Sequence, residues 1–120
     1  MTQPEMQAQL TTERDWVLAR ITGLEAEEEA LNATLAGREQ KVDIAGGEGD
    51  SASVERGAVR TRRQALDARL TELDAAISAL AEGLYGLCVS CGGDIPAERL
   101  AAMPGALECV ACRQAASRRR

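Results

Sequence analysis

Four cysteines near the end of the chain follow the spacing Cys88-x2-Cys91-x17-Cys109-x2-Cys112, which is the strongest constraint on its fold. Two CxxC pairs separated by a stretch of this size are typical of a structural zinc site. Zinc prefers four ligands in a tetrahedron, and thiolates at i and i+3 occupy two adjacent corners from one tight turn. Because the chain has no histidine, all four predicted ligands are sulfur. Such a site has no open position for a substrate, so we predict one zinc ion with a structural role.

Two disulfide bonds, or four unligated thiols, are the alternative explanations for these cysteines. The first 20 residues are polar and acidic and lack the apolar core of a secretory signal. We therefore expect a cytoplasmic protein whose thiols stay reduced. A thioredoxin-like function is not supported, because no βαβ pattern surrounds either pair. We expect Gly92 and Gly93 to let the backbone fold under the metal, where a β-carbon would crowd.

The composition favours helices over sheets. The chain of 120 residues contains one Trp, one Tyr and no Phe, whereas Ala, Leu, Glu and Arg are abundant. With so few large side chains, thin apolar layers between paired helices are the economical way to build a core. No apolar run approaches the roughly 20 residues that a membrane-spanning helix needs, so no membrane partner is expected.

Heptad-like spacing predicts a long antiparallel two-helix coiled-coil hairpin over residues 11–84, preceded by an N-terminal segment at 1–10. Thr11 and Thr12 are the predicted N-caps of a first helix at 11–42, and a second helix is predicted at 53–84. Glu28 interrupts the apolar row of the first helix, and Arg63 fills the one missing step of the second. The predicted rows are Leu10, Val17, Ile21, Leu24, Leu31, Leu35 and Val42, then Val59, Leu66, Leu70, Leu73, Ile77, Leu80 and Leu84.

A glycine-rich tip loop at residues 43–52 separates the two predicted helices. Three glycines within four positions end the first helix and let the chain reverse, and Asp50 or Ser51 can cap the second. One continuous helix in an intermolecular coiled coil is the alternative, but the glycines disfavour it, so we expect a monomer. Asp43, Glu48 and Asp50 place carboxylates at this tip. They could approach a bound cation or a basic loop of a partner, or simply be a solvated polar turn.

Residues 85–120 are predicted to form a small C4 zinc-finger knob and a C-terminal helix that starts at about Glu108. Trp16 would lie at the base end of the hairpin and Tyr85 just before the finger. We expect both aromatic side chains to be core residues and not binding platforms.

The distribution of charge weighs against DNA as the main partner. Residues 1–50 carry 4 basic and 11 acidic side chains, whereas residues 85–120 carry 5 basic and 3 acidic ones. Duplex binding depends on neutralising phosphates, so sequence-specific DNA binding is not expected. A zinc-ribbon DNA-binding protein that uses Arg113 and the tail at 118–120 is one alternative function. A redox-sensing adaptor that loses zinc on oxidation is another. No pattern indicates an enzyme.

The segment around the cysteines resembles the C4 zinc-finger region of the DksA/TraR family. The family pattern [FY]-G-x-C-x-x-C-G-x-x-I is matched at residues 85–95, R-L-x-A-x-P at 99–104, and C-x-x-C at 109–112, with Ala102 at the small-residue position. The predicted hairpin agrees with the architecture of this family, so the resemblance covers most of the chain.

The resemblance implies a transcription regulator that binds bacterial RNA polymerase directly without recognising a DNA sequence. Family members insert the hairpin into the secondary channel of the polymerase and alter the stability of promoter complexes, often with guanosine tetraphosphate. Some promoters are repressed and others activated, and the proteins act in the stringent response. The same function and partners are therefore expected here.

The tip of this chain departs from the family. Well-known members carry D-x-x-D-x-A there, with two aspartates that matter for activity. Counting back from Cys88 places Ala45 and Glu48 near those two positions, so only Glu48 would keep a carboxylate. The resemblance thus implies a partner-binding tip formed by Asp43, Ala45, Glu48 and Asp50.

Overall fold

A computed structural model describes residues 2–40 and 49–118 of the chain. Over these residues the fold is mainly α, as predicted, with four helices in the order α1 (Gln3–Gln40), α2 (Gly49–Ala81), α3 (Ala97–Ala102) and α4 (Val110–Arg118). In the described ranges, β pairing is limited to one isolated antiparallel bridge between Leu87 and Asp94. None of the described helices has a stretch of the length and apolarity needed to cross a bilayer.

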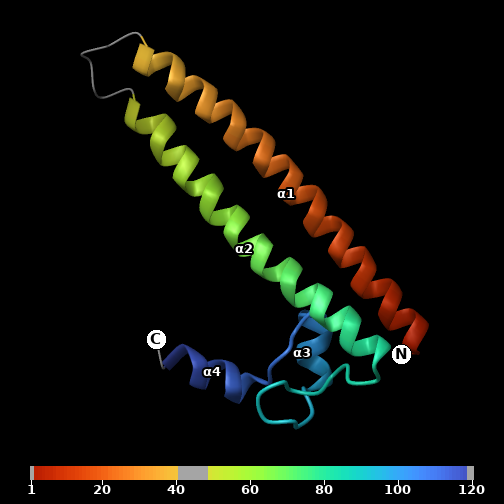
Figure 1. Ribbon diagram of the computed structural model, residues 1–120. Coiled ribbons are helices and arrows are strands. Elements are labelled where there is room, and N and C mark those ends of the chain that lie inside the picture. The colour runs from red at the N-terminus through yellow and green to blue at the C-terminus, as the bar shows by residue number, and fades with distance from the viewer. Residues whose placement is uncertain (1, 41–48, 119–120) are drawn as a thin grey trace. The chain divides into compact units, whose positions relative to one another are not determined.

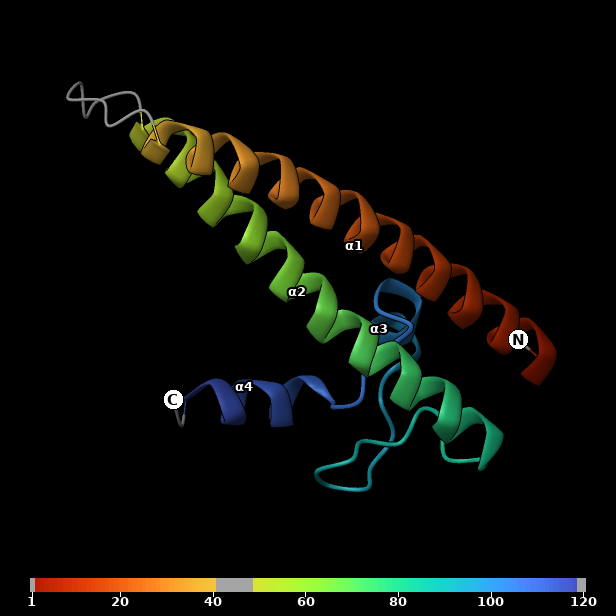
Figure 2. The same ribbon diagram turned by 45° about the horizontal axis from the view of Figure 1, so that its top comes forward.

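The chain divides into two compact units. One contains Met1–Trp16 and Arg69–Arg120, and the other is Val17–Ala68. Within each unit, its part of α1 lies beside its part of α2 in the antiparallel sense (Figure 1). The same pairing is visible after rotation in Figure 2. This confirms the predicted pairing of two long antiparallel helices.

In the unit Val17–Ala68, apolar side chains at heptad positions form the contact between the helices. The buried residues there include Val17, Ile21 and Leu24 of α1 and Ala52 and Val59 of α2. These positions recur at intervals of three, four or seven residues, which keeps one stripe of each helix facing its partner. The predicted seam is therefore present in this unit.

Two of the polar residues that interrupt the predicted seams, Glu28 and Arg63, contact each other. Glu28 of α1 is buried, and its two carboxylate oxygens accept hydrogen bonds of 2.7 Å from Nε of Arg60 and a terminal nitrogen of Arg63. The hydrogen bond from Arg60 and the positive charges nearby lower the pKa of Glu28. A buried carboxylate is tolerated when it is paired in this way.

In the other unit, the parts of α1 and α2 that it contains pack with the segments that follow α2. Its buried apolar residues include Leu10, Leu73 and Leu80. Gly105 approaches α2 so closely that a β-carbon there would lie 3.0 Å from Cδ2 of Leu73. The lack of a side chain at Gly105 is therefore what lets this loop pack against α2.

The first helix begins at Gln3, eight residues before the predicted N-cap Thr11, so the predicted start is wrong. Thr2 is the N-cap instead. Its hydroxyl accepts a hydrogen bond from the backbone N–H of Glu5, and the Glu5 carboxylate accepts one from the backbone N–H of Thr2. This reciprocal capping box satisfies two donors at the helix start, which places most of the predicted N-terminal segment 1–10 inside α1.

The second helix also differs from its predicted bounds. It begins at Gly49, so Asp50 and Ser51 lie in its first turn and the predicted tip loop at 43–52 overlaps the helix. It ends at Ala81 and not at Leu84, because Gly83 adopts a positive φ of 77°. The N–H of Leu84 then donates to the carbonyl of Ala79, as in a Schellman motif. Leu84 is consequently 51% exposed and is not part of the seam.

Trp16 is not the core residue that the sequence predicted. Its side chain is 52% exposed, although it does contact α2, because the guanidinium of Arg69 lies 5.6 Å from the ring centre. Arg69 also forms an ion pair with Glu13, which lies about one turn before Trp16 on α1. Trp16 therefore takes part in a surface cation–π contact.

Candidate metal centre

The first cysteine pair lies in a tight turn after α2. The N–H of Cys88 donates to the carbonyl of Gly93, and the N–H of Gly92 donates back to the carbonyl of Cys88, at 2.8 and 2.9 Å. Gly92 adopts a positive φ of 76° that closes this turn. A β-carbon on Gly92 would meet nothing within 4 Å, and one on Gly93 would lie 3.5 Å from the sulfur of Cys91. Neither position is crowded by the described protein atoms, and Gly92 is needed for its backbone conformation.

The second cysteine pair lies at the start of α4. Cys109 directly precedes this helix, and its carbonyl accepts the first helical hydrogen bond, from the N–H of Arg113 at 3.0 Å. Cys112 is one turn further along the helix. A backbone hydrogen bond of 2.9 Å from Val89 to Leu107 joins the two halves of the site. Two short local structures, a turn and a helix start, thus present two sulfurs each.

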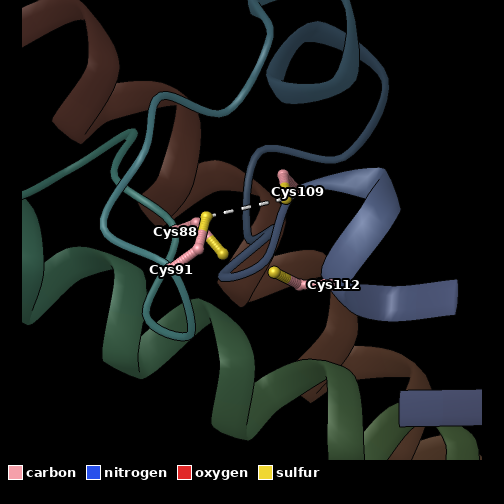
Figure 3. A group of neighbouring side chains, drawn as sticks. All are labelled: Cys88, Cys91, Cys109 and Cys112. Carbon is pink, nitrogen blue, oxygen red and sulfur yellow. Dashed lines mark hydrogen bonds between the residues drawn. The ribbon is translucent and has the colours of Figure 1, made fainter. Parts of the chain in front are cut away.

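The four sulfur atoms converge on one point, as Figure 3 shows. All four lie within 4.8 Å of one another, and those of Cys91 and Cys109 are 4.0 Å apart. A tetrahedral zinc ion with bonds of about 2.3 Å holds its sulfurs about 3.8 Å apart, whereas a disulfide needs about 2.05 Å. The cysteines are not joined by disulfides. The donor set fits a four-thiolate zinc ion, and the disulfide alternative is contradicted.

The electrostatics of the cluster suit a metal with thiolate ligands. The backbone N–H of Cys109, with those of Cys91 and Ser90, lowers the pKa of Cys88 to about 6 despite its burial. The neighbouring sulfurs of Cys109, Cys88 and Cys91 raise the pKa of Cys112 to about 12. Four adjacent thiols cannot all become thiolates unless a cation compensates their charge, and a bound zinc ion supplies it.

Several residues that support this centre are not indicated by the cysteine pattern. The hydroxyl of Tyr85 donates to the carbonyl of Pro104 at 2.8 Å, and burial raises the pKa of this phenol. Ser90 donates to the carboxylate of Glu108, and Arg99 donates to the carbonyl of Glu108. Among these residues, only Tyr85, Arg99 and Pro104 occupy positions of the family pattern. The hydrogen bonds that these residues form have no signal in the local sequence.

The structure does not describe the side chains of the predicted partner-binding residues. Asp43, Ala45 and Glu48 lie outside the described residues. Asp50 lies in the first turn of α2, and the structure does not describe its side chain. Arg113, which the sequence offered as a DNA contact, lies 3.6 Å from the carboxylates of both Glu72 and Glu108.

Comparisons with known proteins agree with this site. Residues 83–118 match the prokaryotic dksA/traR C4-type zinc finger. An uncharacterised protein of Aquifex aeolicus is 39% identical over 51 residues, which cover 42% of this chain and 35% of that protein, so the chain matches about a third of this relative's length.

A likeness over nearly the whole chain comes from a solved structure. The transcription factor DksA2 from Pseudomonas aeruginosa superposes with a TM-score of 0.70 and 25% sequence identity, covering 98% of this chain and 84% of that protein. The likeness therefore includes the paired helices as well as the finger. The four clustered cysteines and the matched C4 finger indicate one structural zinc ion. Residues 83–118 thus carry a DksA/TraR-type zinc finger, and the fold over nearly the whole chain is similar to that of DksA2.

Proposed function

We propose that this protein is a transcription regulator that binds bacterial RNA polymerase directly. The observation that carries the proposal is the likeness to a transcription factor over 98% of the chain, combined with the matched zinc finger. Fold likeness alone does not assign a function, but here the finger matches as well. Members of this family are regulators, and the proposed role involves no catalysis. Because the proposed partner is cytoplasmic, we propose that the protein acts in the bacterial cytoplasm. We also propose that it acts as a monomer.

In the proposed mechanism, the end of the hairpin enters the secondary channel of the polymerase and alters the stability of promoter complexes. The residues proposed to contact the active centre are Asp43, Ala45, Glu48 and Asp50. Glu48 is the proposed counterpart of a family aspartate, so it would supply the main negative charge. A carboxylate at this place can approach a bound magnesium ion or a basic catalytic loop.

An apolar hollow beside the zinc centre supports a protein partner. It has a volume of about 460 Å³ and lies between small side chains of α2, such as Ala75 and Ala79, and the segment that carries the first cysteines. Leu84, Leu87 and Val89 line it and are 51%, 38% and 71% exposed. Contiguous exposed apolar side chains are common where proteins bind one another.

The charges of the described residues weigh against the DNA-binding alternative. Arg113 lies close to two carboxylates, and Arg14 and Arg69 pair with Asp74 and Glu13. Such pairing reduces the positive potential that attracts phosphates. The reduced positive potential also disfavours binding of guanosine tetraphosphate, a polyanion, to the protein alone. We therefore propose this alarmone as a second ligand only in the complex with the polymerase.

Direct titration tests the proposal. Zinc-loaded protein with an N-terminal fluorophore is titrated with RNA polymerase holoenzyme, and the lifetime of open promoter complexes is measured with and without the protein, each with and without the alarmone. We expect saturable binding and an altered lifetime, and only weak, strongly salt-dependent binding to free DNA. No binding at micromolar concentrations, or tight sequence-selective binding to DNA alone, would contradict the proposal.

A further inference from the structure

Glu108 connects the two cysteine pairs of the metal centre. It directly precedes Cys109, and its Oε2 accepts a hydrogen bond of 2.9 Å from the hydroxyl of Ser90. Ser90 lies between Cys88 and Cys91, so this hydrogen bond joins the turn that carries the first pair to the residue that precedes the second. None of the ligand atoms takes part in it.

Two further contacts hold Glu108 in place. Nε of Arg99, in α3, donates to the carbonyl of Glu108 at 2.9 Å. A terminal nitrogen of Arg113, in α4, lies 3.6 Å from Oε1 of Glu108. The Glu108 side chain is 20% exposed, and its hydrogen bond with Ser90 lies at the surface. The short helices on both sides of this residue thus restrain the position from which its carboxylate reaches Ser90.

We propose that Glu108 is a positioning residue for zinc, which holds the two cysteine pairs at the spacing of the metal before the metal binds. Ligands that are already in place lose less conformational freedom on binding, which raises affinity and slows release. Groups outside the ligand set that orient it typically change metal affinity by about 10- to 100-fold. The proposal concerns the metal centre alone and does not depend on the polymerase partner.

The charge of Glu108 works against its hydrogen bond. Four thiolates around one zinc ion carry a net charge of about −2, so a nearby carboxylate repels the loaded site, and Arg113 offsets this only in part. A Gln at this position removes the charge and keeps an oxygen that can accept the hydrogen bond from Ser90, whereas an Ala removes both. Comparing Glu108→Gln with Glu108→Ala therefore separates positioning from charge.

The test measures zinc itself in the full-length protein. Zinc affinity is determined by competition with a chromophoric chelator, and the release rate by transfer to an excess of the same chelator. We expect Glu108→Ala and Ser90→Ala each to weaken zinc affinity about 10-fold and to speed release. Glu108→Gln should stay within about twofold of the parent. The matched control is Glu98→Ala, at an exposed glutamate of α3, which should leave both quantities unchanged.

A double substitution and a spectroscopic check complete the test. If the Ser90–Glu108 hydrogen bond carries the effect, the variant with both alanines should bind zinc no more weakly than either single variant. Cobalt-loaded variants should keep the absorption bands of a tetrahedral tetrathiolate site, which shows that the ligand set is intact. Parent-like affinity and release in Ser90→Ala, additive losses in the double variant, or equal losses in Glu98→Ala would each overturn the proposal.

Discussion

The packing of Gly105 against α2 predicts opposite effects for the same substitution at two glycines. In Gly105→Ala, the new β-carbon would lie 3.0 Å from Cδ2, 3.2 Å from Cγ and 3.4 Å from the backbone nitrogen of Leu73. Leu73 is only 1% exposed, so its side chain has little room to move away. Inserting a methyl group into a packed core typically costs about 1–3 kcal/mol. At roughly 4 °C per kcal/mol for a chain of this size, the melting temperature should fall measurably.

Gly57→Ala is the control, because it lies inside α2 with nothing within 4 Å of its β-carbon position. Removing a glycine from a helix interior should stabilise the protein by about 0.5–1 kcal/mol. Urea denaturation followed by circular dichroism measures both variants. The fluorescence of Trp16, which belongs to the same unit as Gly105, gives a second readout of unfolding.

A second background tests whether Leu73 is the cause. Leu73→Ala alone should cost about 2–5 kcal/mol, because it leaves a cavity in the core. It also removes the atoms that the new methyl group would strike, so Gly105→Ala should cost less in this background than in the parent. If Gly105→Ala is as stable as the parent, or if its cost is the same in both backgrounds, then the close approach to Leu73 does not constrain this position.

The remaining predictions concern the metal, the buried carboxylate and the tip. Cys109→Ser should lose zinc and destabilise the finger while far-UV circular dichroism retains most of the helix; an unchanged melting curve would contradict this. Pairing with arginine lowers the pKa of Glu28 below the usual 4.5. The contribution of ionised Glu28 to folding stability is therefore complete above pH 4.5 and is lost as the pH falls through the lower folded pKa. Glu28→Gln should therefore flatten the acid side of the stability–pH curve, and the exposed Glu29→Gln should not. Glu48→Ala and Asp50→Ala should weaken the effect on transcription without weakening polymerase binding; activity equal to the parent's in both and in the double variant would remove the tip from the mechanism.

The sequence predicted the elements whose signals are local or periodic. Two CxxC pairs predicted a sulfur cluster, because residues three apart in a turn or helix start present both sulfurs to one side. What brings the two pairs together was not predictable, since the Ser90–Glu108 and Val89–Leu107 contacts join residues 18 apart in the chain with no pattern of their own. The ligand set could therefore be predicted from the sequence, but the residues that support it could not.

The heptad pattern predicted the pairing of the helices, and closer use of it would have predicted more. Glu28 and Arg63 each occupy a position in a seam where an apolar residue is expected, and their charges are opposite. On two antiparallel helices this indicates that they face each other. Trp16 directly precedes Val17 of the seam, so the period itself places it outside the buried row.

The helix start was missed for a different reason. Apolar residues are sparse before Leu10, so the period carries little information there. The T-x-x-E pattern of a capping box is nevertheless present at Thr2 and Glu5. Capping residues therefore locate the start of α1 better than its apolar stripe does.

A photo-crosslinker placed at Ala45 tests the central claim most directly. The zinc-loaded protein carrying it is bound to bacterial RNA polymerase and irradiated, and the crosslinked polymerase segments are identified by mass spectrometry. Our account predicts crosslinks on the active-centre side of the secondary channel. Binding with crosslinks confined to other surfaces would contradict the insertion of the tip, and a lack of binding at micromolar concentrations would contradict the proposed partner itself.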